Sequence, residues 1–497
     1  MKLSDIIEQV SIKSASGALD VDIDGVCYDS RQASVGKLFC ALPGEKVDGN
    51  DFVAKAIENG ASAILSEQPS PPDSTIPWLL VRDARVAMAQ AAATLYGHPS
   101  RALPVIGITG TNGKSTTAFL IHHLIECSWY RVGLIGTVYY QIGDEIRDAP
   151  HTTPESADLQ ALLAEMREEE CRAAVMEVSS HGLAQHRVDG VRFAAGVFTN
   201  LSQDHLDYHR TLDAYFAAKR LLFEQIEAQG ESGKNAPALI INRDDRHGER
   251  LAKQSFPHTR MITFGMGALC DFKASNIRTD FNGTQFQLTI EGRKLLVKMP
   301  LIGRFNVYNA LAALATAHAI GLNFREAIKS LESVPQVPGR LESVSDRQIN
   351  YRVYVDYAHT PDALENALKT IRELNPRRLI TVFGCGGDRD QGKRPLMGAI
   401  AERLSDVAFL TSDNPRTEDP EQIIAQTKAG MKGARSVVVV DRRDAIEQAI
   451  KLAGERDIVL IAGKGHEDYQ EINGVRHPFD DRLVANQCIA AKSESGV

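Results

Sequence analysis

The sequence is 497 residues long, and its composition, with 43% hydrophobic and 24% charged residues, is that of a globular protein of about three domains. The formal net charge is −8, so the chain as a whole does not attract nucleic acid or an anionic membrane surface. Local basic sites for small anions are still compatible with this charge.

The chain shows no targeting or membrane-spanning pattern. Its first residues have scattered charges and no apolar core, unlike a signal peptide, and no apolar run is long enough to cross a bilayer. The seven cysteines are dispersed and form no CxxC pair, which argues against disulfides and a thiolate zinc site. We expect a cytoplasmic monomer without membrane insertion.

Residues 1–100 predict a first α/β domain. Residues 38–44 have the pattern of a strand, 56–67 that of a helix followed by a strand, and 66–77 contain a proline- and serine-rich surface loop. Residues 81–100 have helical periodicity that stops at Gly97 and Pro99. We place the first domain boundary there.

Residues 101–335 predict a central domain. The stretch LPVIGITGTNGKSTTAFLIHHLIE, which begins at Leu103, reads as a buried strand, a glycine turn and a helix, and 173–180 and 194–202 read as further buried strands. This alternation favours a mainly parallel sheet, in which ligands bind at the carboxyl ends of the strands.

Residues 336–497 predict a third domain. The segment SVPQVPGRLE at 333–342 is the boundary and the expected hinge, and beyond it strands again alternate with polar or glycine-rich turns. The fold class expected from the whole pattern is α/β with three domains: a central P-loop-type, mainly parallel sheet and a C-terminal Rossmann-like doubly wound domain.

A phosphate-binding loop is predicted at GITGTNGKST. The strict pattern requires a glycine where this chain has Ile108, but the order of strand, loop, GKS and helix is correct. Backbone N–H groups at the helix start can hold phosphates, Lys114 can reach their outer oxygens, and Ser115 is placed to ligate Mg²⁺. The alternative is a glycine turn that only connects strand and helix.

Lys219 falls on the apolar side of a predicted helix. Its neighbours at helical spacing are Tyr215, Phe216, Leu222 and Phe223. Burial there would lower the lysine pKa and favour a neutral amine, which can pair with an acid, act as a base, or add CO₂ to form a carbamate that ligands Mg²⁺. A lysine that extends to the surface is the open alternative.

Acids and histidines gather at predicted strand ends. Glu177 ends one strand, and TNLSQDHLDYH, with Asp204, His205, Asp207 and His209, follows another. Oxygen ligands dominate this set, so Mg²⁺ is favoured over zinc, although each residue alone is also typical of a solvated loop.

These motifs together resemble the Mur ligase family, the ATP-dependent amino-acid ligases of peptidoglycan synthesis. The resemblance rests on GTNGKST, MEVSSHGL, TNLSQDHLDYH, AAKRLLF, FNVYNALAALA, PGRLE and DYAHTPDAL, and it covers nearly the whole chain. The segments CGGDRDQGKRPLMG, DNPRTEDP and AGKGHEDYQ are similar to the branch that adds diaminopimelate to a UDP-muramoyl dipeptide.

The resemblance implies that the three domains bind the UDP substrate, ATP and the incoming amino acid, in that order. It implies carbamylation of Lys219, catalytic roles for Lys114, Lys219, His205 and Glu177, and Mg²⁺ held by Ser115, Glu177, His205 and the modified lysine. The ATP contacts that it implies are Gly110, Thr111, Asn112, Gly113, Lys114, Ser115, Thr116, Asn306, Arg340 and Asp356.

For the UDP-muramoyl dipeptide, the family pattern implies contacts from four segments, CYDSR, GEKVDG, HTTPE and SSHGLAQHR. These are Tyr28, Ser30, Glu45, Lys46, Val47, Thr152, Thr153, Ser179, Gln185 and Arg187.

For diaminopimelate, the implied residues all follow predicted strands of the third domain. They are Arg389, Asp413, Asn414, Pro415, Arg416, Gly463 and Glu467. A two-pronged contact from Arg416 would recognise the carboxylate that lysine lacks, and Glu467 would bind the adjacent ammonium.

Three other readings are weaker. A folylpolyglutamate synthetase shares the phosphate loop and the modified lysine, but DNPR and AGKGHEDYQ argue against it. A nucleotide-dependent regulator is disfavoured by Ile108 and by the dense polar region, and a non-catalytic binding protein by the intact set of lysine, serine and acid.

Overall fold

Three sheets follow one another along the chain in this computed structural model, and most of their strand pairs are parallel. The structure describes residues 1–44, 47–129, 131–230, 233, 236–344, 349–433 and 436–494. Glu45 and Lys46, two of the predicted substrate contacts, lie outside these ranges. The three-part α/β fold class is confirmed.

The first sheet has the order β1-β5-β4-β3-β2, and only its β1–β5 pair is antiparallel. Its strands are β1 (Ile12–Ser16), β2 (Gly25–Cys27), β3 (Lys37–Cys40), β4 (Ala63–Ser66) and β5 (Trp78–Val81), with helices α1 (Leu3–Ile7), α2 (Val53–Glu58) and α3 (Ala84–Leu95). Helix α3 begins after Asp83, whose carboxylate accepts hydrogen bonds from two backbone N–H groups, and ends before Gly97 as predicted.

The central sheet has eleven strands in the order β16-β15-β14-β13-β12-β11-β6-β10-β7-β8-β9. The strands from β14 to β7 are parallel to their neighbours, and antiparallel hairpins extend both ends. The bounds are β6 (Val105–Thr109), β7 (Gly133–Ile135), β8 (Tyr139–Ile142), β9 (Glu145–Asp148), β10 (Ala174–Glu177), β11 (Phe193–Phe198), β12 (Ala238–Asn242), β13 (Arg260–Gly265), β14 (Phe272–Asp280), β15 (Gly283–Ile290) and β16 (Arg293–Met299).

Helices cover both faces of the central sheet, so its middle strands are buried on both sides. One face packs against α4 (Lys114–Trp129) and α10 (Arg304–Ala319), and the other against α5 (Ser156–Glu168) and α8 (Leu212–Gln229). The shorter helices of this part are α6 (Ser180–Ala184), α7 (Leu206–His209), α9 (Arg246–Ala252) and α11 (Phe324–Ser330).

The third sheet has the order β17-β18-β22-β19-β20-β21 and is parallel except at β17, with a separate antiparallel ribbon β23–β24. Its strands are β17 (Glu342–Ser343), β18 (Arg352–Asp356), β19 (Leu379–Phe383), β20 (Val407–Leu410), β21 (Ser436–Val438), β22 (Ile458–Ala462), β23 (Tyr469–Ile472) and β24 (Val475–Pro478). Helices α12 (Pro361–Glu373), α13 (Lys393–Leu404) and α14 (Pro420–Lys428) cover one face, and α15 (Arg442–Leu452) and α16 (Asp481–Glu494) the other.

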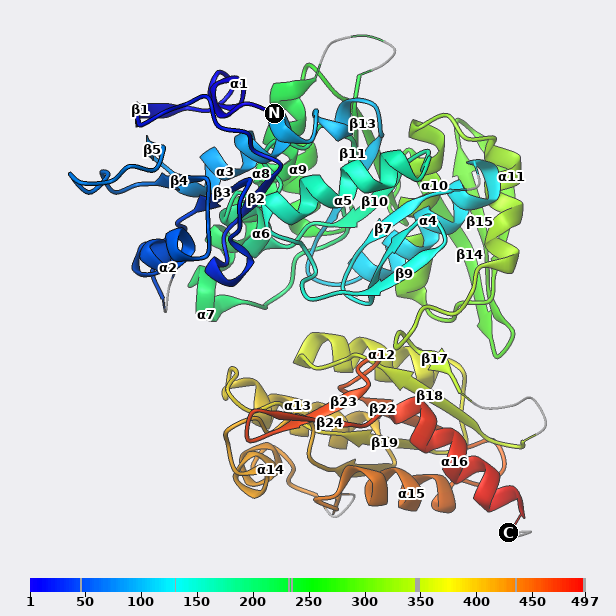
Figure 1. Cartoon of the computed structure of the whole chain (residues 1–497). Helices are drawn as coiled ribbons and strands as arrows, with labels where there is room; N and C mark the ends of the chain where they lie inside the picture. Colours follow the sequence, from blue (N-terminus) through cyan, green and yellow to red (C-terminus); the bar gives the residue numbers. More distant parts are fainter. Residues whose placement is uncertain are drawn as a thin grey trace.

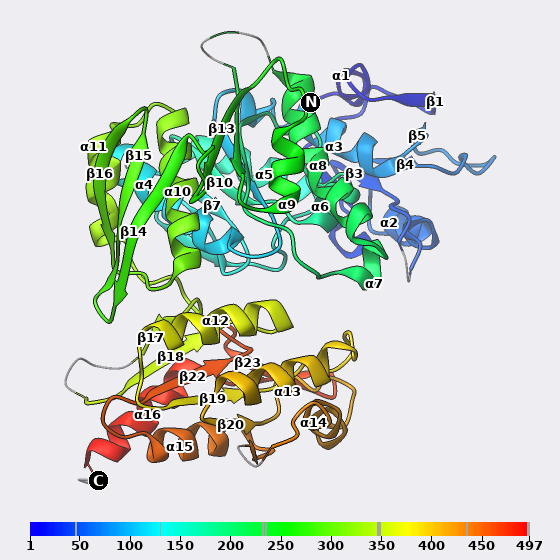
Figure 2. The ribbon, with the colours of Figure 1, turned by 180° about the vertical axis from the view of Figure 1, so that it is seen from behind.

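The third unit lies below the other two in Figure 1, with α12 and β17 on the side that faces the central unit. The same elements face the central unit from behind, and the tip of the β14–β15 hairpin reaches towards β17 in both views (Figures 1 and 2). The third unit therefore turns α12, β17 and the segment that leads into β17 towards the central unit.

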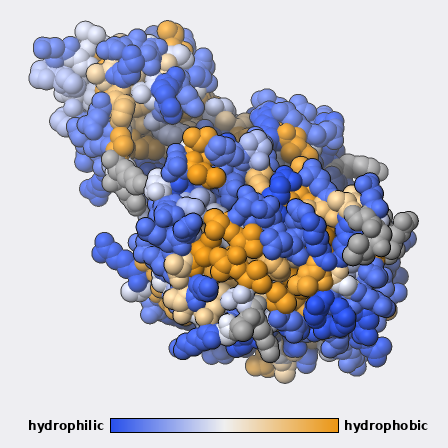
Figure 3. Space-filling model, turned by 90° about the horizontal axis from the view of Figure 1, so that it is seen from below, coloured by the Kyte–Doolittle hydropathy of each residue, from blue (hydrophilic) through white to orange (hydrophobic). Residues whose placement is uncertain are grey.

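The face seen from below is mainly hydrophilic and carries a hydrophobic area near its centre (Figure 3). In the third unit, the exposed hydrophobic residues include Val437, Val438 and Val440, on and next to the edge strand β21, and Leu452 at the end of α15. No helix in the described part of the chain has both the length and the apolarity needed to span a bilayer.

A buried ion pair ties three elements of the third unit together. Arg442, at the start of α15, donates to Asp481 at 2.8 and 2.6 Å and to the carbonyl of Ala462 at 3.1 Å. Both side chains of the pair are 0% exposed. The pair thus fixes the starts of α15 and α16 at the end of β22.

Replacing Arg442 with Met should lower the free energy of unfolding by about 3–5 kcal/mol, because Asp481 would keep a buried charge without its partner. Denaturant unfolding measures the effect. The control is Arg443→Met, because Arg443 is exposed and bonds only Gln487 at its Nη1. Equal stability of the two variants would contradict the structural role of the pair.

Candidate active site

The loop between β6 and α4 has the geometry of a phosphate cradle. Gly110 and Gly113 have φ angles of 149° and 84°. A Cβ atom on Gly113 would lie 2.5 Å from the Asn309 Oδ1 atom, and one on Gly110 would contact Thr199. Only glycine fits both places, so the chain turns tightly between β6 and α4, and binding of phosphates by the N–H groups at the start of α4 stays a prediction.

Two lysines share one carbonyl oxygen of this loop. Lys114 Nζ donates to the Gly110 and Thr111 carbonyls at 3.0 and 2.9 Å, and Lys219 Nζ donates to the Gly110 carbonyl at 2.7 Å. Lys219 is 1% exposed, so it does not extend to the surface, which decides between the two alternatives for this residue.

The electrostatic environment favours a neutral amine at Lys219. Burial lowers its pKa well below the usual value of 10.5, and the charge of Lys114 lowers it further. Burial also lowers the pKa of Lys114. The neutral form of Lys219 is the one that can react with an electrophile or accept a proton.

The predicted metal ligands surround the same loop. Glu177, at the end of β10, is 1% exposed, and its carboxylate accepts from the Thr137 N–H at 2.9 Å and from the Thr137 hydroxyl at 3.1 Å. The Ser115 hydroxyl accepts from Arg340 at 3.1 Å. Among the described residues, no group of three His, Cys, Asp or Glu side chains forms a ready-made metal site.

This donor set fits Mg²⁺ better than a closed metal cage. Mg²⁺ in proteins is usually bound by one or two carboxylates together with water and substrate phosphates, and Glu177 and Ser115 supply oxygens of this kind beside a phosphate loop. The ammonium of unmodified Lys219 is a donor only and cannot ligate a cation.

His205 precedes α7 in a left-handed conformation with φ of 52°. Its Nε2 atom lies 3.5 Å from an Asp204 oxygen, and its ring centroid is 4.9 Å from that of His181. Burial lowers the His205 pKa to about 4 although Asp204 opposes the shift. The ring is therefore neutral at physiological pH and has a free lone pair for a ligand.

Two of the three further ATP residues make contacts within their own unit. The Asn306 amide donates to the Ile302 carbonyl at 2.8 Å and accepts from Asn309 at 2.9 Å. The Asp356 carboxylate accepts from the N–H groups of Leu341 and Ala358 at 2.7 and 2.8 Å. In this structure both side chains support nearby backbone, so their nucleotide contacts stay predictions.

Most of the predicted UDP-substrate residues lie in one hydrogen-bond network. The Thr153 hydroxyl donates to the Glu177 carbonyl at 2.9 Å and accepts from the Ser179 N–H at 2.9 Å. Arg187 donates to the Thr153 carbonyl at 2.9 Å and to the Gln185 side chain at 2.7 Å. The network thus joins these residues to strand β10, which carries Glu177.

The other residues predicted to bind the UDP substrate lie beside this network or apart from it. Thr152 bonds the Thr137 hydroxyl at 3.0 Å, and Tyr28 of the first unit donates to Asp158 of α5 at 2.6 Å. Ser30 is buried below the first sheet's surface, and Val47 is exposed. No hydrogen bond between described residues links Ser30 or Val47 to the Thr153 network.

The third unit contacts the phosphate loop at points that the motifs alone did not reveal. Asp362, in the first turn of α12, accepts from the Asn112 amide at 2.8 Å and from the Ser202 hydroxyl at 3.0 Å. Arg340 reaches Ser115 from the linker. Asp362 lies inside the motif DYAHTPDAL and Ser202 inside TNLSQDHLDYH. Membership of these motifs is the sequence feature that could have pointed to the two residues.

The DNPR loop is fixed by the ribbon β23–β24. Arg416 has a left-handed φ of 53°, its N–H donates to the Glu471 carbonyl at 3.0 Å, and its carbonyl accepts from the Asn473 N–H at 2.6 Å. Its guanidinium donates to the Gly387 carbonyl at 2.6 Å, and its Nε atom is 3.6 Å from a Glu471 carboxylate oxygen. The Arg416 guanidinium is therefore held by the Gly387 carbonyl, while its distance to the Glu471 carboxylate is longer than a hydrogen bond.

Asn414 and Glu467 meet at a buried lysine that sequence reasoning missed. Lys464 is 0% exposed, and its Nζ atom donates to Asn414 at 2.9 Å and to Glu467 at 3.0 Å. The Asn414 amide donates to the same Glu467 oxygen at 2.8 Å. Burial raises the Glu467 pKa, and Lys464 opposes that shift. Lys464 stands inside AGKGHE, between the two residues that were selected.

The remaining residues predicted to bind diaminopimelate differ in their placement. Asp413 is buried, and its Oδ2 atom lies 3.7 Å from Arg442. Gly463 has a φ of 124° and approaches Asp413 so closely that a Cβ atom would clash. Pro415 is buried in the same loop, whereas Arg389 is exposed and donates to the adjacent Asp388 carbonyl at 3.0 Å. The structure therefore groups the set with the exception of Arg389.

Comparison with known proteins assigns the class. Three family models match: the Mur ligase family catalytic domain over residues 22–96, the Mur ligase middle domain over 108–317 and the Mur ligase glutamate ligase domain over 339–465. The chain belongs to the Mur ligase family and is a ligase that uses ATP.

Particular relatives are similar over nearly their whole length. UDP-N-acetylmuramoyl-L-alanyl-D-glutamate–2,6-diaminopimelate ligase of Geobacter metallireducens is 44% identical over 499 residues, with 97% of each chain covered. The protein of the same name from Listeria monocytogenes is 44% identical with 99% of each chain covered. A solved structure of a ligase with this name superposes with a TM-score of 0.71 at 36% identity and covers 99% of each chain.

Replacing Asp362 with Ala should loosen the third unit, because two side-chain hydrogen bonds across the seam are lost, at about 1 kcal/mol each. We expect a larger radius of gyration by small-angle scattering. Glu365→Ala on the same helix is the control, since Glu365 bonds Lys369 and Arg403 of its own unit. Identical scattering from both variants would show that the hydrogen bonds of Asp362 do not hold the third unit against the central unit.

Proposed function

We propose that the chain joins meso-2,6-diaminopimelate to UDP-N-acetylmuramoyl-L-alanyl-D-glutamate in peptidoglycan biosynthesis, with release of ADP and phosphate. The proposal rests chiefly on the buried contact of Asn414 with Lys464 and Glu467, which joins the DNPR loop to AGKGHE. The full-length relatives with this name support it, and they favour it over the folylpolyglutamate alternative. A cytoplasmic location and a monomeric state stay predictions.

The chemistry has two steps. A carboxylate oxygen of the dipeptide attacks the γ-phosphorus of ATP, the bond to ADP breaks, and an acyl phosphate forms. The amine of diaminopimelate then attacks the acyl carbon, and phosphate leaves with its electron pair. Lys114, at the phosphate loop, would balance negative charge on the transferred group in the first step.

The metal would lie between the phosphate loop and β10. We assign Ser115, Glu177, His205 and carbamylated Lys219 as the residues that hold Mg²⁺, which when bound would neutralise charge on the phosphate oxygens. The carbamate forms when the neutral Lys219 amine adds to CO₂ and loses a proton. It would turn a donor beside Lys114 into an anionic ligand, so the low lysine pKa supports this assignment.

The substrate residues are assigned by unit. The network of Thr152, Thr153, Ser179, Gln185 and Arg187, with Tyr28 beside it, would hold the UDP-muramoyl dipeptide. Asn306, Arg340 and Asp356 would contact ATP once the third unit adjusts. Arg416 would exchange its loose Glu471 contact for the far carboxylate of diaminopimelate.

Lys219→Ala should be nearly inactive, and a short-chain carboxylate should restore part of the activity by filling the place of the carbamate. The measurement is ATP-dependent phosphate release with and without added formate or acetate. Arg220→Ala is the control, since Arg220 pairs with Glu224 along the helix surface. Full activity of Lys219→Ala would refute the carbamate.

The amine specificity is tested with meso-diaminopimelate, L-lysine and L-ornithine in the same assay. We expect diaminopimelate to be favoured by about 10⁴-fold in kcat/KM, because lysine would leave the Arg416 fork without its carboxylate in a closed pocket. Arg416→Met should remove most of this difference. A preference for lysine would refute the substrate assignment but leave the ligase chemistry intact.

Lys464→Met should raise KM for diaminopimelate by roughly tenfold and leave KM for ATP unchanged, since Asn414 and Glu467 lose a charged donor worth about 1.5–3 kcal/mol. A thermal melt identifies loss of folding, and exposed Lys428→Met in α14 is the control. An equal rise in both KM values would mean that Lys464 has a general structural role.

A further inference from the structure

The loop after β18 lies at the seam between the central and third units. It contains His359, a residue of the motif DYAHTPDAL to which the site described above gives no role. Directly after this loop, in the first turn of α12, Asp362 accepts from Asn112 of the phosphate loop at 2.8 Å. We propose that the His359 Nε2 atom accepts the proton that the incoming amine loses before it attacks the acyl phosphate. The inference rests on the proposed function.

The hydrogen bond of the His359 ring fixes its tautomer. The Nδ1 atom lies 2.8 Å from the Tyr357 carbonyl oxygen, which can only accept, so Nδ1 carries the hydrogen and donates it. In the neutral ring the lone pair is then on Nε2. No hydrogen bond from another described residue engages Nε2, and His359 is exposed. The Nε2 atom is therefore available to a ligand.

The Tyr357 ring connects His359 to both halves of the reaction. Its centroid is 4.6 Å from that of the His359 ring and 5.1 Å from that of His466, which belongs to AGKGHE. The Arg340 guanidinium lies 4.8 Å from the same Tyr357 ring and donates to Ser115 of the phosphate loop. His359 thus lies between the segment assigned to the amine and the loop assigned to the phosphates.

Charged groups of both units act on His359. The surrounding protein removes water from the ring, and this loss, followed by the charge of Lys393 in α13, lowers the His359 pKa below its usual value of 6.5. Arg340 lowers the pKa further, whereas Asp204 of the central unit opposes the shift. The charge of His359 also lowers the pKa of Asp413 in the DNPR loop. The ring is therefore neutral at neutral pH and within electrostatic reach of both units.

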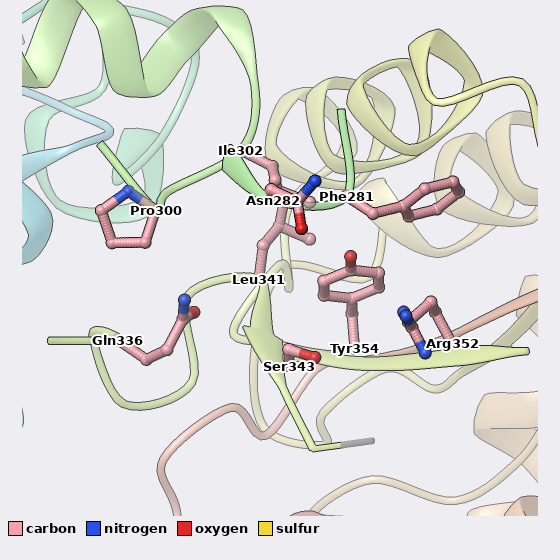
Figure 4. Close-up of a pocket in the computed structure, with 9 residues that line it drawn as sticks. All are labelled: Phe281, Asn282, Pro300, Ile302, Gln336, Leu341, Ser343, Arg352 and Tyr354. Carbon is pink, nitrogen blue, oxygen red and sulfur yellow. The ribbon is translucent and has the colours of Figure 1, made fainter. Parts of the chain in front are cut away.

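The seam is not completely filled near this loop. A pocket with a volume of about 230 Å³ lies between the β14–β15 turn and the strands β17 and β18 (Figure 4). Its lining includes Leu341, the residue after Arg340, and Tyr354 of β18. Strand β18 ends directly before the loop of His359. The free volume beside this strand allows the loop to move towards the phosphate loop when the units close.

The proton transfer gives the amine the lone pair that its attack requires. At neutral pH the free amino acid carries an ammonium group, which cannot attack a carbon atom. Transfer of one proton to Nε2 yields a neutral amine and an imidazolium. The amine then forms the C–N bond, the C–O bond to phosphate breaks with its electron pair, and the departing phosphate takes the second proton. Asp204 favours the imidazolium, since it raises the His359 pKa.

The test compares two nucleophiles on the full chain and on His359→Asn, whose amide can keep a hydrogen bond to the Tyr357 carbonyl. With diaminopimelate, the kcat of the variant should fall by about 10²-fold at neutral pH, because the general base is lost. Hydroxylamine is largely unprotonated at neutral pH, so both proteins should form hydroxamate from ATP and the dipeptide at similar rates. His258→Asn is the control, because His258 is exposed and pairs with Glu227 of α8.

The pH profile is a second measurement, which a purely structural role would leave unchanged. The kcat of the unaltered chain should fall on the acid side as His359 becomes protonated, whereas the kcat of His359→Asn should rise steadily with pH as more amine loses its proton. Equal kcat values with diaminopimelate, parallel pH profiles, or an equal loss of the hydroxylamine reaction would overturn the role of His359. Absence of hydroxamate from the unaltered chain would instead refute the acyl phosphate, and with it the proposed function.

Discussion

The carbonyl oxygen of Gly110 is the point on which the nucleotide-binding end of the molecule depends. It accepts hydrogen bonds from both Lys114 and Lys219, and the two side chains come from helices on opposite faces of the central sheet. Two ammonium groups at one buried oxygen repel each other, so at least one favours its neutral form. Burial at this oxygen, together with the charge of Lys114, lowers the pKa of Lys219.

The same loop is also where the third unit attaches. Asp362 holds Asn112 and Ser202, and Arg340 holds Ser115, so the loop that should bind phosphates also carries the contacts that position the amino-acid unit. Under the proposed assignment Ser115 and Asn112 also bind the nucleotide, so nucleotide binding should alter these contacts. The seam between the central and third units is therefore the place where domain closure is expected.

Much of this could be predicted from the sequence, because the decisive signals are local. Glycine spacing around Lys114, the apolar neighbours of Lys219 and the helix stop at Gly97 each lie within a few residues. Contacts between distant segments gave no such signal: Lys464 meets Asn414 across 50 residues, and Asp362 meets Asn112 across 250. Asn306 and Asp356 show a second difficulty. Their motifs imply contacts with ATP, but in this structure the Asn306 amide and the Asp356 carboxylate bond nearby backbone groups.

The ribbon β23–β24 and the DNPR loop form one structural unit, separate from the phosphate loop. The ribbon and the loop bond each other through Arg416, Glu471 and Asn473, all within the third unit, and none of these residues contacts the phosphate loop among the described contacts. Under the proposed assignment, selection of the incoming amine and activation of the carboxylate are thus carried by separate sheets. Evolution could exchange one amine for another by altering this ribbon and loop while the phosphate chemistry stayed unchanged.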